Sequence, residues 1–177
     1  MNNELSVLIT TPHGVQLKLN ATELTVPSVE GDFGVLPGHL PVLAGLRTGI
    51  VRATVNGEVQ QFAVGPGFVQ VSQDSASILT DRFLRKEEVD AVVARKELKE
   101  AEEVLANMST STPPEELYPA LSAARWAAVC LELYGDPPPA TVTMMLETRM
   151  LGHEDYAAAL AQAESESEPS KDGVSGA

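Results

Sequence analysis

The sequence predicts a β plus α protein, with an antiparallel β-sandwich over residues 1–84 and an antiparallel two-helix hairpin over residues 85–134. An extra acidic tail, started by prolines and partly disordered, is expected over residues 135–177. Two changes of pattern support this division. Apolar residues alternate with polar ones in the first part, and they recur at steps of three and four in the second. After Glu164 the composition is typical of disorder.

The first 84 residues contain about eight short apolar runs with the period of a β-strand. Leu5, Val7 and Ile9 form the first alternating run. Asn56-Gly57 separates two further runs, at 50–55 and 59–64, and this dipeptide favours a type I′ hairpin turn. Short strands at close spacing, with no helical period between them, indicate a sandwich or barrel.

Two narrow apolar stripes predict the two helices, and a polar loop over residues 107–111 joins them. Small alanines let the helices approach closely but bury little area, so the hairpin is expected to be marginally stable. The first stripe consists of Ala91, Ala94, Leu98, Ala101 and Leu105. The second consists of Leu117, Leu121, Ala124, Ala128 and Leu131.

Prolines mark the limits of the second helix. Thr112 and Glu115 have the spacing of a capping box, with a proline directly after Thr112 at the first helical position. Pro119 lacks a backbone donor, so the helix is expected to kink there or to start near it. Gly135, followed by Asp136 and three prolines, ends the helix. Residues 140–163 can form one more helix, although they show no regular apolar stripe.

The charge and the hydropathy exclude several classes of function. The formal net charge is −13, and residues 135–177 alone carry eight acidic and two basic side chains. This charge disfavours both nucleic-acid binding and direct adsorption to an anionic membrane. No apolar run reaches the ~20 residues that a membrane span requires. Membrane association is therefore expected only through another protein, and the N-terminus shows no secretory signal.

The sequence offers no catalytic or metal-binding constellation, so we expect a protein that is not an enzyme and has no cofactor. His13, His39 and His153 lie far apart, and none has a second ligand at metal spacing. Cys130 has no positioned base beside it, is expected to be a small buried or half-buried helix residue, and suits a reducing compartment. A glycine-rich phosphate loop of the Walker type does not occur.

Residues 30–39 read EGDFGVLPGH and are predicted to be a loop of defined shape, because Gly31, Gly34, Gly38 and Pro37 constrain the backbone. The continuation HLPVLAGLRTGIVR adds a second set of glycines and prolines. Over about twenty residues this stretch resembles the epsilon subunit of the rotary (F-type) ATP synthase. The usual extent of that family is a sandwich plus a hairpin, which corresponds to about residues 4–134 here and leaves the tail without an interpretation.

The resemblance implies a central-stalk (rotor) subunit of a proton- or sodium-driven ATP synthase, peripheral on the cytoplasmic face of the bacterial inner membrane. Such a subunit couples rotation of the c-ring to the catalytic head through gamma. The positions aligned with the family's c-ring contact are Gly31, Asp32 and Phe33, and those nearer gamma are His39, Leu40 and Pro41. His39 can equally be a hydrogen-bonding residue that anchors its own loop.

The resemblance also implies that the hairpin regulates the enzyme. Docked on the sandwich it permits turnover, and extended along gamma toward the alpha and beta subunits it blocks ATP hydrolysis. Lys96, Lys99 and Arg125 are then expected to face an acidic stretch of beta. Some members bind ATP through an Asp-x-x-Arg motif on the hairpin, and here Asp90 is present while Val93 replaces the arginine. The alternative is a stand-alone β-sandwich binding or adaptor module that dimerises through its hairpin.

Overall fold

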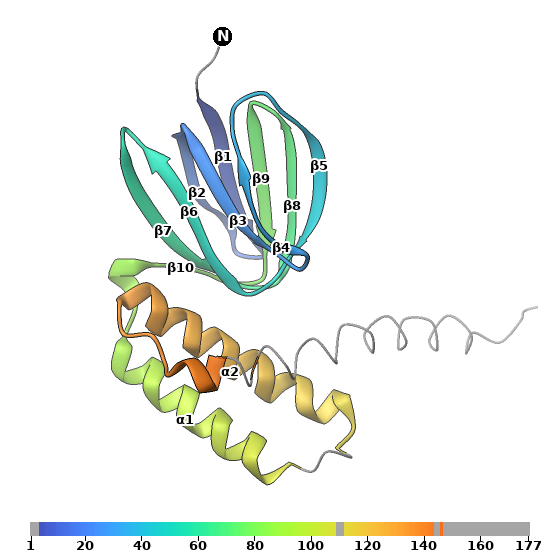
Figure 1. Cartoon of the computed structure of the whole chain (residues 1–177), viewed down its shortest axis with the longest axis vertical. Coiled ribbons are helices and arrows are strands. Elements are labelled where there is room, and N and C mark those ends of the chain that lie inside the picture. Colours follow the sequence, from blue (N-terminus) through green and yellow to red (C-terminus); the bar gives the residue numbers. More distant parts are fainter. Residues whose placement is uncertain (1–3, 109–111, 144–145, 147–177) are drawn as a thin grey trace, which may run out of the picture.

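The computed structural model describes residues 4–108, 112–143 and 146. Within these residues, ten strands come first in the chain, and a short 3-10 turn at Lys86–Glu88 leads into two helices, α1 (Ala91–Asn107) and α2 (Pro114–Tyr134) (Figure 1). The strands are β1 (Leu5–Thr11), β2 (Gly14–Ala21), β3 (Glu23–Ser28), β4 (Gly31–Val35), β5 (His39–Leu46), β6 (Gly49–Val55), β7 (Glu58–Val64), β8 (Gly67–Gln73), β9 (Ser75–Thr80) and β10 (Phe83–Arg85).

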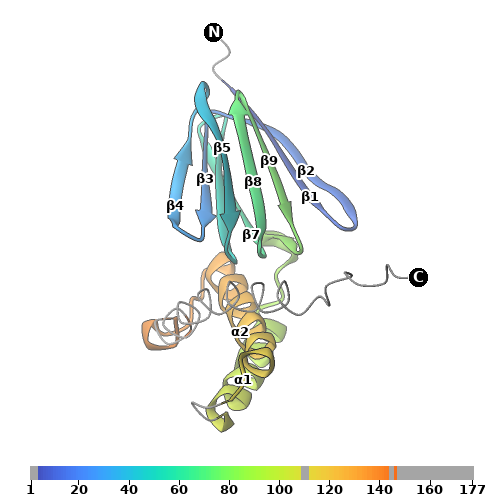
Figure 2. The same ribbon diagram turned by 90° about the vertical axis from the view of Figure 1, so that its right-hand side faces the viewer.

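The strands form one continuous hydrogen-bonded sheet that folds over on itself as a sandwich, close to a barrel (Figure 2). Their order is β10-β7-β6-β3-β5-β8-β9-β1-β2, and β4 pairs with β3 at the side. The prediction of an antiparallel sandwich holds for the described pairs apart from one. β1 and β9 are parallel, with Ser6 opposite Ser75 and Thr10 opposite Leu79. This pairing joins the first strand to one of the last, so strands from the two ends of the β-rich segment lie side by side in the sheet.

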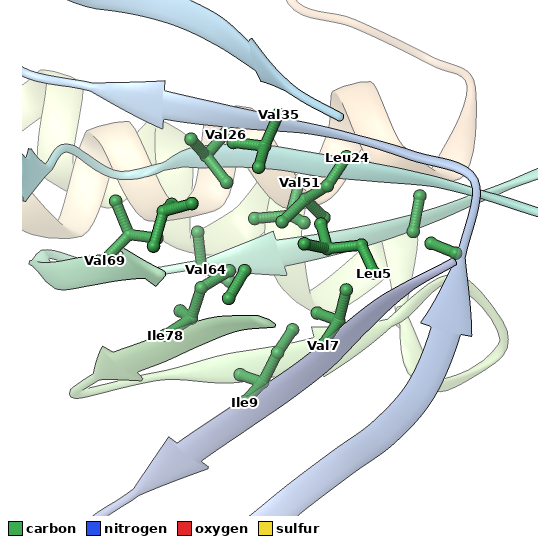
Figure 3. Packing of buried hydrophobic residues seen from close by; sticks show 14 of the residues in the cluster. Leu5, Val7, Ile9, Leu24, Val26, Val35, Val51, Val64, Val69 and Ile78 are labelled. Carbon is green, nitrogen blue, oxygen red and sulfur yellow. The ribbon is translucent and has the colours of Figure 1, made fainter. Parts of the chain in front are cut away.

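The interior of the sandwich contains the apolar residues that the alternating pattern places on one face of each strand. Leu5, Val7 and Ile9 of β1 are buried, as are Val69 of β8 and Ile78 of β9 (Figure 3). Asn56 and Gly57 have φ values of 52° and 84°, so the positive φ angles of the predicted β6–β7 turn are confirmed. Local sequence determines these features, because both depend on period and turn chemistry alone.

The prediction that residues 30–39 form a loop is wrong for most of the segment. Residues 31–35 are strand β4, which pairs with β3, and β5 begins at His39 and pairs with β8. Only residues 36–38 form the turn between them, where Gly38 has a φ of 79°. Gly31 has a φ of 120°, so glycine is required at this position as well. Strands as rich in glycine and proline as these are not apparent from propensity, because pairing with distant strands forms them.

The helical hairpin agrees with the predicted stripes. All five residues of the first stripe are buried, as are Leu121, Ala124, Ala128 and Leu131 of the second, while Leu117 is half-buried. α2 begins at Pro114, one residue later than a capping box at Thr112 predicts. Its N-cap is Pro113 and no side chain caps it, so the predicted Thr112 capping box is wrong. The helix continues through Pro119, which lies at an exposed position.

The hairpin lies against the end of the sandwich that β6, β7 and β10 form (Figure 1). Val129 and Leu133 of α2 are buried against Ile50 of β6 and Ala63 of β7. Residues 140–143 are helical after the prolines, and the expected disorder of residues 164–177 falls outside the described residues. No helix in the described part of the chain is long and apolar enough to cross a membrane.

Candidate partner-binding surfaces

The residues expected at the c-ring lie together at the β3–β4 turn. Gly31 and Asp32 are exposed, whereas Phe33 is half-buried and packs against the sandwich core. They line a shallow depression of about 300 Å³ together with His39, so the fold brings the two predicted contact groups side by side. The full lining is Ser28, Glu30, Gly31, Asp32, Phe33, His39, Val42 and Ala44.

Asp32 is paired within the chain. Nη2 of Arg47 donates to Oδ1 of Asp32 at 2.5 Å, and both side chains remain more than one-third exposed. Arg47 lies just beyond β5, and its backbone N–H donates to the carbonyl oxygen of Pro27 on β3. Sequence reasoning did not single out Arg47, because the two residues are 15 positions apart and only strand pairing brings them together.

His39 has the geometry of a loop anchor. Its Nδ1 lies 2.7 Å from the carbonyl oxygen of Leu40, and because a carbonyl only accepts, this nitrogen carries the proton. Its ring centroid lies 6.4 Å from that of Phe33. Leu40 and Pro41 are exposed, and Leu40 keeps 80% of its surface accessible. Of the three residues expected near gamma, these two therefore present their side chains to a partner most openly.

An apolar face continues from Pro41 across the outside of the sheet. Leu43 of β5, Phe68 of β8 and Leu79 of β9 are 70%, 61% and 56% exposed. Register places Phe68 opposite Leu79 on one side and opposite Gly45 on the other. We call Leu43, Phe68 and Leu79 the outer apolar face. Sequence analysis missed it, because an apolar residue in a strand does not reveal whether its face is covered.

The basic and acidic residues expected on the hairpin have different environments. Asp90 caps α1, and its Oδ1 accepts hydrogen bonds from the backbone N–H groups of Val92 and Val93. Lys96 and Lys99 are exposed and pair with glutamates one turn further along α1. Arg125, by contrast, is only 8% exposed, so it cannot face another protein while the hairpin is folded as it is here.

A groove of about 600 Å³ runs between α1 and α2, with Trp126 and Arg82 at one end. Its other lining residues are Glu97, Glu100, Ala101, Val104, Ala120 and Ala123. Two of these carry negative charge, and Arg82 alone carries positive charge, which does not match a triphosphate. In the described part of the chain, no group of three His, Cys, Asp or Glu side chains could hold a metal ion.

Comparison with known proteins identifies the family. The family model of the ATP synthase delta/epsilon chain β-sandwich domain matches residues 4–86. The ATP synthase epsilon chain of Leptospira interrogans is 38% identical over 102 residues, which cover 58% of this chain and 80% of that protein. The chain belongs to the ATP synthase epsilon chain family. The epsilon chain of Nitratidesulfovibrio vulgaris is 32% identical over 124 residues, or 70% of this chain and 92% of the relative.

Solved structures share the fold of this epsilon chain. A chain of the Euglena gracilis mitochondrial ATP synthase matches with a TM-score of 0.62 at 23% identity, covering 72% of this chain and 79% of that one. A chain from the central stalk and c-ring of the Tetrahymena thermophila mitochondrial ATP synthase matches with a TM-score of 0.52 at 18% identity. It covers 73% of this chain and 96% of the other.

As an epsilon chain, the protein is a non-catalytic subunit of ATP synthase.

The environment of Cys130 is that of a structural residue. It is buried in α2, as predicted, and this burial, with a smaller contribution from Glu97, raises the pKa of its thiol to about 11. A thiol that stays protonated at neutral pH is a poor nucleophile and a poor metal ligand.

Proposed function

We propose that this chain is the rotor subunit that joins the c-ring to gamma in the central stalk of a bacterial ATP synthase. The subunit then lies at the cytoplasmic face of the inner membrane, held there by the complex. Family membership supports this assignment. The structural observation that supports it most directly is the outer apolar face. Three large apolar side chains exposed on adjacent strands indicate a surface that another protein covers.

Gamma is the partner that we assign to the outer apolar face and to Leu40 and Pro41 beside it. Alanine-scanning studies of protein interfaces generally find that a few large anchors supply most of the binding energy. Phe68, flanked by Leu79 and near Leu43, has the size and exposure of such an anchor. His39 is assigned to hold the backbone at Leu40 in position, through its hydrogen bond to the Leu40 carbonyl.

The c-ring is the partner that we assign to the β3–β4 turn. Gly31 and Asp32 are exposed there, and Phe33 forms part of the adjoining depression. Arg47 holds the Asp32 carboxylate, so this turn presents an oriented ion pair to the polar loops of the ring. Because the pair is partly exposed, its role is orientation and not stability.

The hairpin is proposed to inhibit ATP hydrolysis after leaving the docked position described here. Docking uses few contacts, chiefly Val129, Leu133 and Trp126 against the end of the sandwich. A small interface suits an element whose two states differ by a few kcal/mol. In the extended state, Lys96, Lys99 and Arg125 are proposed to face an acidic stretch of beta. ATP binding on the hairpin is not part of the proposal, because Val93 cannot pair with phosphate.

Co-purification of a tagged chain tests the assignment, with variants that separate its surfaces. The Leu43→Glu variant is expected to lose gamma, alpha and beta, whereas Val59→Glu on the exposed side of β7 is expected to retain them. Removal of residues 85–177 is expected to raise hydrolysis by the recovered complex. Unchanged hydrolysis would remove the inhibitory role and leave the coupling role. A free chain that dimerises and recovers none of these subunits would favour the adaptor module.

A further inference from the structure

We propose that residues 135–143 and Leu146, here called the C-terminal strap, latch the helical hairpin in its folded form. The strap follows α2 and turns back over the hairpin (Figure 1). Its meaning for regulation rests on the proposed function of the hairpin. The latch itself is a property of the isolated chain, and three features of the described residues carry it.

The first feature is the reversal of the chain at the end of α2. Gly135 has a φ of 105°, and its backbone N–H donates to the carbonyl oxygen of Leu131 at 3.1 Å. The N–H of Asp136 donates to the same oxygen at 2.9 Å. Three prolines follow and restrict the backbone, so the strap leaves the helix in a set direction.

The second feature is an ion pair between the strap and the other helix. Nε and Nη2 of Arg95 both donate to Oδ2 of Asp136, at 3.0 and 2.6 Å. Arg95 lies near the start of α1, whereas Asp136 follows the end of α2. The pair therefore closes the end of the hairpin opposite the loop that joins the helices. Because both side chains are half-exposed, salt is expected to weaken it.

The third feature is apolar contact. The N–H of Val142 donates to the carbonyl oxygen of Pro139 at 2.9 Å, so a helical turn starts directly after the prolines. Val142 is half-buried against the hairpin cluster, and Leu146 belongs to that cluster with 0% of its surface exposed.

These contacts matter because the hairpin has little apolar area of its own. Three of the five buried residues on α1 are alanines, which contribute little to burial. A fully buried leucine from the strap is a large addition to such a cluster. If α1 is to separate from α2, the Arg95–Asp136 pair must break, and the side chain of Leu146 must enter water. The strap therefore sets how often the hairpin opens.

The match to the Nitratidesulfovibrio vulgaris epsilon chain covers 92% of that protein but only 70% of this one. That relative is therefore shorter than this chain.

Amide hydrogen exchange of the full-length chain without partners tests the strap. Asp136→Asn is expected to accelerate exchange in α1 about twofold to fivefold, and Leu146→Ala at least about tenfold. The matched control is Glu103→Gln, which removes one carboxylate from an exposed ion pair within α1. This control is expected to change exchange by less than about twofold. Added salt should accelerate exchange in α1 more in the wild type than in Asp136→Asn.

Either of two results would contradict the proposal that the strap latches the hairpin. One is α1 exchange in both strap variants that matches the control. The other is equal acceleration in the strands of the sandwich, which would mean global destabilisation and not release of a latch. The measurement needs no ATP synthase subunit. If the chain does not co-purify with gamma, the proposal that the strap latches the hairpin is unaffected. If exchange shows that the strap does not latch the hairpin, the assignment as a rotor subunit is unaffected.

Discussion

The guanidinium of Arg82 lies over the ring of Trp126, with its Cζ 5.6 Å from the ring centroid. Arg82 precedes β10 at the end of the sandwich, and Trp126 belongs to α2, so this contact joins the two parts of the molecule. Trp126 is the only tryptophan in the chain. Its fluorescence therefore reports directly on whether the hairpin is docked.

Replacing Arg82 with Gln is expected to loosen the docked hairpin slightly. Loss of a partly exposed cation–π contact costs about 0.5–1 kcal/mol. We expect a red shift in the emission of Trp126 at temperatures below the unfolding of the sandwich. Emission identical to that of the wild type would mean that the contact contributes nothing to docking.

Replacing Leu133 with Ala is expected to undock the hairpin more strongly. Leu133 is almost fully buried between α2 and the sandwich, and removing such a side chain costs about 2–4 kcal/mol. The adjacent Tyr134 is half-exposed, so Tyr134→Ala is the matched control. Trp126 emission should shift in the first variant only. A shift of equal size in both would place the docking contacts elsewhere.

Replacing Asp32 with Asn is expected to weaken assembly with the c-ring while leaving the fold intact. The Arg47 pair is partly exposed, so the free energy of unfolding should fall by less than about 1 kcal/mol. Binding of the variant to membranes that contain the ring should fall measurably. Lys18→Gln, at an exposed position on β2, should retain binding. Full binding by Asp32→Asn would remove Asp32 from the proposed contact.

Replacement by alanine should have very different effects at two glycines that lie in strands. A Cβ on Gly67 would lie 1.9 Å from the carbonyl oxygen of Leu79, so Gly67→Ala should lower the free energy of unfolding by about 3 kcal/mol or more. Gly34 has open space at the same position, and Gly34→Ala should change stability by less than about 0.5 kcal/mol. Urea unfolding of both variants measures this, and equal stabilities would contradict the close β8–β9 approach.

The thiol of Cys130 makes stability depend on alkaline pH. Burial raises its pKa from 9.0 to about 11, so the folded chain holds this proton more tightly than the unfolded chain. The resulting stability is complete below pH 9 and is lost as the pH rises toward 11. From roughly pH 8 to pH 10, the wild type should lose about 1 kcal/mol more than Cys130→Ala. Parallel urea-denaturation curves for the two proteins across this range would contradict a buried thiol.

The hairpin was the most predictable part of the structure. Its stripes follow the helical period, and period is a local property, so every residue of the first stripe is buried as expected. The β6–β7 turn is predictable for the same reason, because Asn56-Gly57 carries its own backbone preference. The capping of α2 was not predictable in this way, because the N-cap residue is Pro113 and not Thr112.

Tertiary structure alone decided several features of this protein. These are strands β4 and β5, the parallel β1–β9 pair, the Asp32–Arg47 pair and the outer apolar face. Each depends on strands brought together from distant parts of the chain, and register across such pairs leaves no local trace in composition. Burial of Leu146 against the hairpin belongs with them. The sequence by itself determined the two kinds of secondary structure and the family, through periodicity and the EGDFGVLPGH segment. Which side chains meet, and which apolar faces stay uncovered, depends on long-range packing.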